Sequence, residues 1–144
     1  QCLVGSEMCI RDRRLRGIDI RKEMTNEWKR AGVTDPKQYA ILTNILTAAW
    51  SGKTVQEYKK LKGLKKENLR DNMTNTELVL NALAEVSTTE ISKATDPKGM
   101  SGAKDATIQG GNIAKNARES LEKQIGRSVL SPLNSNTPNL LDDK

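Results

Sequence analysis

Histidine and phenylalanine are absent from this 144-residue sequence, and aromatic residues make up only 3% of it. The lack of histidine excludes Ser-His-Asp and Cys-His catalysis, histidine metal sites and imidazole pH switching within the chain. Two cysteines are too few for a disulfide framework and cannot form a structural zinc site alone. The other residues offer no nucleophile–base pair and no metal-ligand cluster. The sequence therefore predicts a protein that is not an enzyme and has no metal, cofactor or small-molecule substrate.

Long hydrophobic runs are also missing. The least polar stretch, residues 39–50, contains Thr and Asn and is too short to span a bilayer. The length fits one domain. Hydrophobic residues make up 35% of the chain, and 24 Lys and Arg against 18 Asp and Glu give a formal net charge of +6. These values predict a basic, soluble protein without a membrane segment.

Residues 1–13, QCLVGSEMCIRDR, have no clear period, and the character of the chain changes at Arg14. The run over residues 3–12 resembles the translation of a transposase-type sequencing adapter. The alternative is a signal peptide, but Glu7 interrupts its apolar run and no small-residue cleavage site follows. We interpret residues 1–13 as an adapter-derived artefact. Both cysteines then lie outside the natural sequence, and the natural N-terminus is expected to be missing.

Apolar residues recur at spacings of three and four along much of the remaining chain, which is typical of amphipathic helices. Helix starts are expected where Asp35 precedes Pro36 and at capping boxes that open at Thr54 and Thr74. No alternating pattern is long enough to predict a strand. We therefore predict an all-α fold, a compact bundle of about five helices over residues 14–126, with residues 127–144 as a disordered tail.

Several faces are predicted to be buried. The first helix, ending at Gly32, contributes Ile20, Met24, Trp28 and Ala31, and the strongest core segment contributes Tyr39, Ile41, Leu42, Ile45, Leu46, Ala49 and Trp50. The helix that begins after Thr74 has an expected buried stripe of Leu78, Val79, Ala82, Leu83 and Val86. Before it, Leu64, Leu69 and Met73 suggest another turn or two of helix. Ser87 and Glu90 mark either a break or the polar face of a continuing helix.

The last helix is expected over residues 101–125 and contains Gly110 and Gly111. Each glycine inside a helix costs about 1 kcal/mol relative to alanine, so the pair suggests a kink or a close approach by another helix. The neighbouring small residues, Ala103, Ala106, Ala114 and Ala117, favour the close approach.

Positive charge is concentrated in one segment, which we name the basic corner. It contains Lys53, Lys59, Lys60, Lys62, Lys65, Lys66 and Arg70 against only Glu57 and Glu67, a net charge of +5 in eighteen residues. Such a cluster attracts phosphates or an acidic protein partner, although a merely solvated helix face is the alternative. Because no aromatic residues alternate with the lysines for base stacking, any nucleic-acid contact is expected to be with the backbone.

Several short motifs resemble the C-terminal region of the DNA-damage-inducible protein D family and its relatives, the prophage antirepressor-like proteins that carry an N-terminal Bro-N domain. They are RKEMTNEWKRAGV at 21–33, QYAILTN at 38–44, KGLKK at 62–66, LRDNMT at 69–74, TEL at 76–78, STTEI at 87–91 and GGNIAKNAR at 110–118. The resemblance covers about residues 17–130. It implies a cytoplasmic protein of bacteria or their prophages, linked to the SOS response to DNA damage or to phage repression. It supplies no catalytic residues, and the Bro-N domain, thought to bind DNA, is not part of this chain.

Two functions follow as hypotheses. The first is a non-enzymatic regulatory or interaction domain whose basic corner contacts a DNA backbone or a nucleoprotein complex. The second is an oligomerisation module for the missing N-terminal domain. It is suggested by the small-residue face from Ala103 to Ala117 and by an apolar ridge of Ile113, Leu121 and Ile125.

Overall fold

A computed structural model describes the backbone of residues 6–130 and the side chains of residues 17–130. Its elements are α1 (Ser6–Arg30), α2 (Pro36–Ser51), α3 (Val55–Leu61), the 3-10 turn η1 (Arg70–Asn72), α4 (Asn75–Thr95) and α5 (Gly99–Ile125). No strand occurs within residues 6–130. The all-α prediction is therefore confirmed. The backbone of α1 begins at Ser6, inside the segment interpreted as an adapter artefact, and that interpretation stays a prediction.

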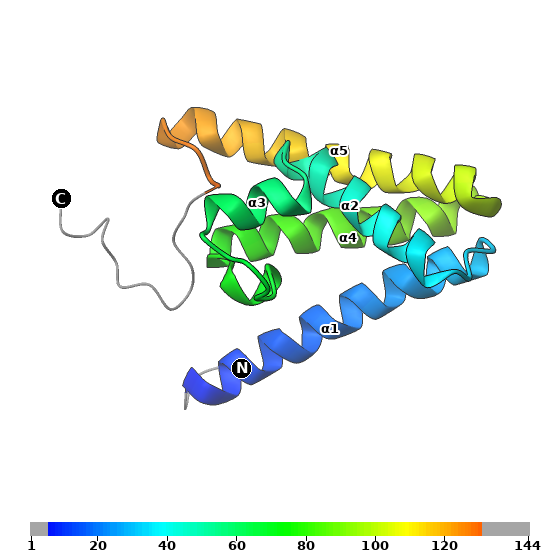
Figure 1. The fold of residues 1–144 in the computed structure, drawn as a ribbon, viewed down its shortest axis with the longest axis horizontal. Coiled ribbons are helices and arrows are strands. Elements are labelled where there is room, and N and C mark those ends of the chain that lie inside the picture. The colour runs from blue at the N-terminus through cyan, green and yellow to red at the C-terminus, as the bar shows by residue number, and fades with distance from the viewer. Residues whose placement is uncertain (1–5, 131–144) are drawn as a thin grey trace.

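The long helices α4 and α5 lie side by side, α2 packs on both, and α1 packs against α4 (Figure 1). Short α3 follows α2 and contacts it. Figure 1 shows α1 crossing the bundle at an angle, with its C-terminal end near the α4–α5 turn. The Gly99 backbone N–H donates to the carbonyl of Ala31 at 2.6 Å, which ties this turn to the end of α1.

The expected helix starts are confirmed. The Asp35 carboxylate accepts a hydrogen bond from the Lys37 N–H at 2.9 Å, and Pro36 occupies the first turn of α2. Thr54 and Thr74 both form complete capping boxes, each with the glutamate three residues later. These caps satisfy backbone N–H groups that the first turn of a helix leaves without partners.

The aromatic residues lie in the core, as the sequence predicts. Trp28, Trp50 and Tyr58 are at most 1% exposed, and Tyr39 packs against Trp28 with ring centroids 6.0 Å apart. The Trp28 indole donates to the Thr107 hydroxyl at 3.1 Å and joins α1 to α5. The Trp50 indole donates to the side-chain oxygen of Asn81 at 3.2 Å and joins α2 to α4. The two tryptophans thus pin the outer helices to the central pair.

The glycine pair marks a close approach, and α5 runs through it unbroken. A Cβ atom on Gly110 would lie 2.5 Å from the backbone nitrogen of Thr88 in α4. A Cβ on Gly111 would overlap the Cβ of Ala49 in α2. Both helices therefore approach α5 at the two residues that carry no side chain.

The predicted buried stripe of α4 is wrong. Val79 is 67% exposed and Val86 40% exposed, whereas Leu78, Ala82 and Leu83 are only partly buried. The buried residues are Glu77, Leu80, Asn81, Ala84, Glu85, Thr88, Thr89 and Ser92. This face is mostly polar, but its hydroxyls donate to carbonyls of the same helix or to Glu27, and its amide and carboxylates have partners on other elements. Polar groups that find such partners can be buried. The helix continues past Ser87 and Glu90 without a break.

Two further expectations need correction. Between Gly63 and Thr74 the only helical turn is η1, because Gly63 ends α3 with a φ of +70°. Leu69 and Met73 are nevertheless buried, so these residues pack as core without a helix. Residues 127–130, predicted as the start of a disordered tail, are instead ordered, since Val129 and Leu130 are buried against the bundle and Val129 N–H donates to the Glu122 carboxylate at 2.9 Å. Residues 131–144 lie outside the described residues.

Candidate nucleic-acid interface

The seven basic residues predicted as a site do not form one surface. Lys60, Lys65 and Lys66 are exposed, and Lys53 and Lys59 are half-buried. Lys62 and Arg70 instead make ion pairs with carboxylates of α4. The fold therefore divides the basic corner into cations open to a partner and cations that hold the corner in place.

Lys62 belongs to a buried polar cluster. Its side chain is 1% exposed, and its ammonium lies 2.7 Å from the carboxylate of Glu77, which is also fully buried. Tyr58 donates its hydroxyl proton to the same carboxylate. Burial and the neighbouring Glu77 raise the pKa of Tyr58, so this phenol stays protonated and donates. Because Lys62 is enclosed, it cannot contact a macromolecular ligand in this fold.

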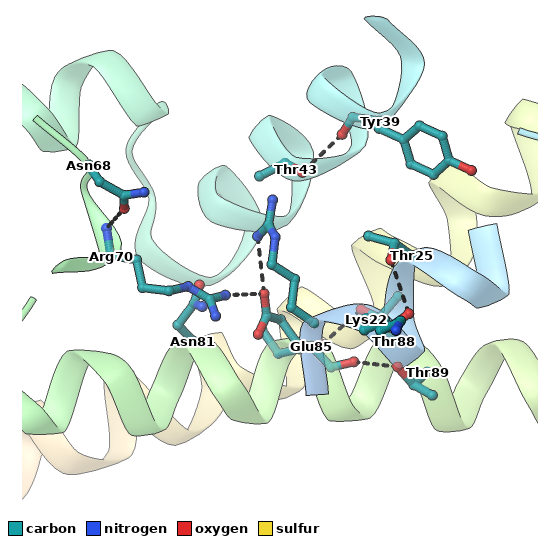
Figure 2. Close-up of polar contacts among 12 residues, drawn as sticks. Lys22, Thr25, Tyr39, Thr43, Asn68, Arg70, Asn81, Glu85, Thr88 and Thr89 are labelled. Atoms are coloured by element: carbon teal, nitrogen blue, oxygen red, sulfur yellow. Dashed lines mark hydrogen bonds and ion pairs between the residues drawn. The ribbon is translucent and has the colours of Figure 1, made fainter. Parts of the chain in front are cut away.

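Arg70 takes part in a second arrangement, centred on Glu85. The Arg70 guanidinium points at the Glu85 carboxylate and bonds to it (Figure 2). The guanidinium of Arg21, from α1, reaches the same carboxylate oxygen at 3.4 Å. Asn68 accepts the backbone N–H of Arg70 at 2.8 Å and fixes the start of η1. One carboxylate thus brings together two arginines that lie far apart in the sequence.

Glu85 lies at the inner wall of a cavity of about 740 Å³ between α1, α2, α3, η1 and α4. Five cations line this cavity, and we name them the cationic rim: Arg21, Lys22, Lys59, Lys66 and Arg70. Among the residues whose side chains the structure describes, Glu85 is the only acidic one that lines it. Only three residues of the predicted basic corner belong to the rim; Lys53, Lys60 and Lys65 do not line the cavity.

The electrostatics of the cavity favour an anion. Glu85 is 1% exposed, and burial raises its pKa, while the charges of Arg70 and Arg21 lower it. The side chains of Arg21 and Arg70 remain 43% and 28% exposed, so their guanidinium groups can still meet a ligand. A positively charged concave surface attracts and concentrates anions more strongly than scattered surface charges do.

Sequence reasoning missed three of the charged residues. Arg21 and Lys22 look like part of an ordinary polar helix face, and Glu85 looks like a solvent-facing residue beside an apolar stripe. Only the packing of α1 on α4 brings them to the basic corner. One signal was available: α4 has glutamates at 77 and 85, eight residues apart, and such spacing places both on one helix face.

No cluster of acidic or thiol ligands that could hold a metal ion is present among the described residues. In the same part of the chain, no helix combines the length and the apolar character needed to cross a membrane. The residues that line the cavity offer charge, hydrogen bonds and apolar contact to a ligand.

Comparison with known proteins identifies the domain. Residues 9–138 match the family described as the DinD C-terminal domain, DinD_C. The searches of curated proteins and of solved structures found no match. The family match spans most of the chain and agrees with the resemblance found in its motifs. This chain therefore belongs to the DinD C-terminal domain family.

Proposed function

We propose that this domain is a non-enzymatic regulatory module that binds the phosphate backbone of DNA, free or within a nucleoprotein complex, through the cationic rim. The observation that carries the proposal is the charge of the cavity: five cations from α1, α3, η1 and the segment before η1 converge, and one buried carboxylate opposes them. Membership of a family named for a DNA-damage-inducible protein supports a bacterial cytoplasmic setting in which DNA is one of the polyanions within reach.

The type of contact follows from the side chains. The four aromatic residues are in or against the core, so none is available to stack on several successive bases. Lysines and arginines on a rim neutralise phosphates and release counterions, which gives binding that depends strongly on salt and little on sequence. Lys60 and Lys65, exposed next to the rim, would extend this backbone contact.

Salt dependence tests the proposal. Five phosphate contacts with duplex DNA predict a slope of log affinity against log salt of about −4.5, or a loss of about 500-fold between about 50 and 200 mM salt. Reversing three rim charges with Lys22→Glu, Lys59→Glu and Lys66→Glu should flatten the slope by about 3. The matched control reverses three exposed lysines elsewhere, Lys29, Lys37 and Lys104. If the control weakens binding as much as the rim variant, or if affinity does not change with salt, the proposal is wrong.

Oligomerisation is the second candidate. The small-residue face that suggested it is already packed against other helices of the same chain, because Ala103, Ala106, Gly110 and Ala114 are buried inside the bundle. Ile113 and Ile125 of α5 are still 45% and 42% exposed, and these two favour a contact with another copy. Light scattering of the full chain tests it. Self-association that Ile113→Lys and Ile125→Lys abolish would support this function, and a strict monomer at high concentration would exclude it.

A further inference from the structure

We propose that the cavity receives one nucleotide of a single DNA strand, with its phosphate on the cationic rim and its base against an apolar wall. This inference rests on the proposed function and deepens it, because a duplex backbone would need the rim but not the wall. The cavity volume of about 740 Å³ lies within the range of about 300–1,000 Å³ that is typical of small-ligand sites.

The apolar wall is the first argument. The same cavity that holds the five cations is lined by Ile18, Leu46, Val55, Leu69 and Met73. A phosphate group gains nothing from such a wall, whereas an unstacked base has an apolar face that can be buried against it. Met73 adds a specific preference, since its thioether sulfur makes favourable contacts with aromatic rings.

The hydrogen-bonding groups of the wall are the second argument. Asn81 lines the cavity, and its side-chain oxygen accepts the indole N–H of Trp50 at 3.2 Å. That bond orients the amide and leaves its NH₂ group as the donor for a ligand. Purine and pyrimidine edges carry ring nitrogen and carbonyl acceptors, which such a donor matches.

The third argument is the placement of the arginines. Glu85 binds the guanidinium groups of Arg21 and Arg70 through one carboxylate oxygen, so both guanidinium groups are ordered before a ligand binds. A guanidinium has five N–H donors in a fixed plane, and the bond to Glu85 uses only some of them. The remaining donors match the paired oxygens of a phosphate. Glu85 is therefore a positioning residue for the phosphate contact.

An acidic peptide is the main alternative occupant. Its carboxylates would bind the rim, but aspartate and glutamate side chains supply no flat apolar group for the wall. Polyglutamate added as a competitor separates the two. If it displaces a single-stranded oligonucleotide as well as an unlabelled strand of equal charge does, the nucleotide proposal is overturned.

The decisive comparison uses the full wild-type chain and three probes of equal length: an intact single strand, the same strand without bases, and a duplex. All three carry phosphates, but only the intact single strand offers an unstacked base. We expect it to bind about tenfold more tightly than the abasic strand, since burying one apolar face of a base against the wall is worth about that much. Equal affinity for the intact and abasic strands would overturn the nucleotide proposal, and steep salt dependence of both would leave the backbone proposal standing. Failure of all three probes to bind would overturn both.

Variants locate the effect. Thr43 lines the cavity from α2, and Thr43→Trp would fill the space without changing any charge. It should bring the affinity for the intact strand down to that for the abasic strand. Ile41→Trp is the control, because Ile41, which the sequence wrongly predicts to be buried, is an exposed residue of the same helix that does not line the cavity. It should keep the tenfold preference. A Thr43→Trp protein that folds, as judged by circular dichroism, and keeps the full preference would place the base elsewhere and contradict the proposal.

Discussion

Gly110 in α5 lies directly against the backbone of Thr88 in α4, with room for a hydrogen atom but not for a side chain. A Cβ atom at residue 110 would be 2.5 Å from the Thr88 nitrogen and 2.7 Å from its Cα. Because these are backbone atoms, no rotation of a side chain can relieve the overlap. Helices α4 and α5 therefore meet at a distance that only glycine permits.

Gly110→Ala is expected to destabilise the domain. The overlap with α4 forces the helices apart, and overpacking of this kind costs about 1–3 kcal/mol, which exceeds the gain of about 1 kcal/mol in helix propensity. Urea unfolding followed by circular dichroism measures the change. The control is Gly17→Ala, since a Cβ on helical Gly17 meets nothing within 4 Å and should raise stability by up to about 1 kcal/mol. A Gly110→Ala domain as stable as wild type would refute the close packing.

Lys62→Ala is expected to destabilise the domain far more than Lys60→Ala. The first change leaves the Glu77 carboxylate buried without its cation, and breaking a buried pair costs about 3–5 kcal/mol. The second removes an exposed side chain and should stay within about 0.5 kcal/mol. Both values come from the free energy of unfolding in urea. Similar losses for the two lysines would contradict the burial of Lys62.

Glu85→Gln is expected to change how stability depends on pH. The folded pKa of Glu85 is raised above its ordinary value of 4.5, so the folded state binds this proton more tightly than the unfolded state does. The stability due to the protonated form is full below about pH 4.5 and is lost as pH rises through the raised pKa. Relative to wild type, the glutamine variant should therefore become more stable as pH increases from about 4 to about 8. Thermal unfolding across that range tests this, and parallel curves for the two proteins would contradict it.

Val79→Ala is expected to leave stability within about 0.5 kcal/mol, whereas Leu80→Ala should cost about 2–5 kcal/mol. The reason is the orientation of α4, which exposes 67% of Val79 and only 6% of the adjacent Leu80. The amphipathic pattern of the sequence places Val79 in the buried stripe, so the pair separates the two orientations. A larger loss at Val79 than at Leu80 would restore the sequence-based assignment.

Helix boundaries were accessible from the sequence because they depend on local chemistry. The proline after Asp35 and the capping boxes at Thr54 and Thr74 involve residues within one turn of each other, so no distant contact is needed to form them. The same is true of the aromatic core, since large apolar side chains at helical spacing have few alternatives to burial. The close approach at Gly110 could also be predicted from the sequence, because a glycine pair inside a helix is unfavourable unless helix packing requires it.

What only the tertiary structure decided is which side of α4 faces inward and which cations share a cavity. Both depend on contacts between residues that lie far apart in the chain. Glu77 pairs with Lys62, and Asn81 accepts a hydrogen bond from Trp50. Glu85 pairs with Arg21 and Arg70. A polar residue is stable inside only when such a partner arrives with it, and that depends on the packing of whole helices. The sequence alone therefore determined the helices, their caps and the excess of positive charge. The fold turned part of that charge inward as ion pairs and gathered the rest, with Arg21 and Lys22, around one cavity.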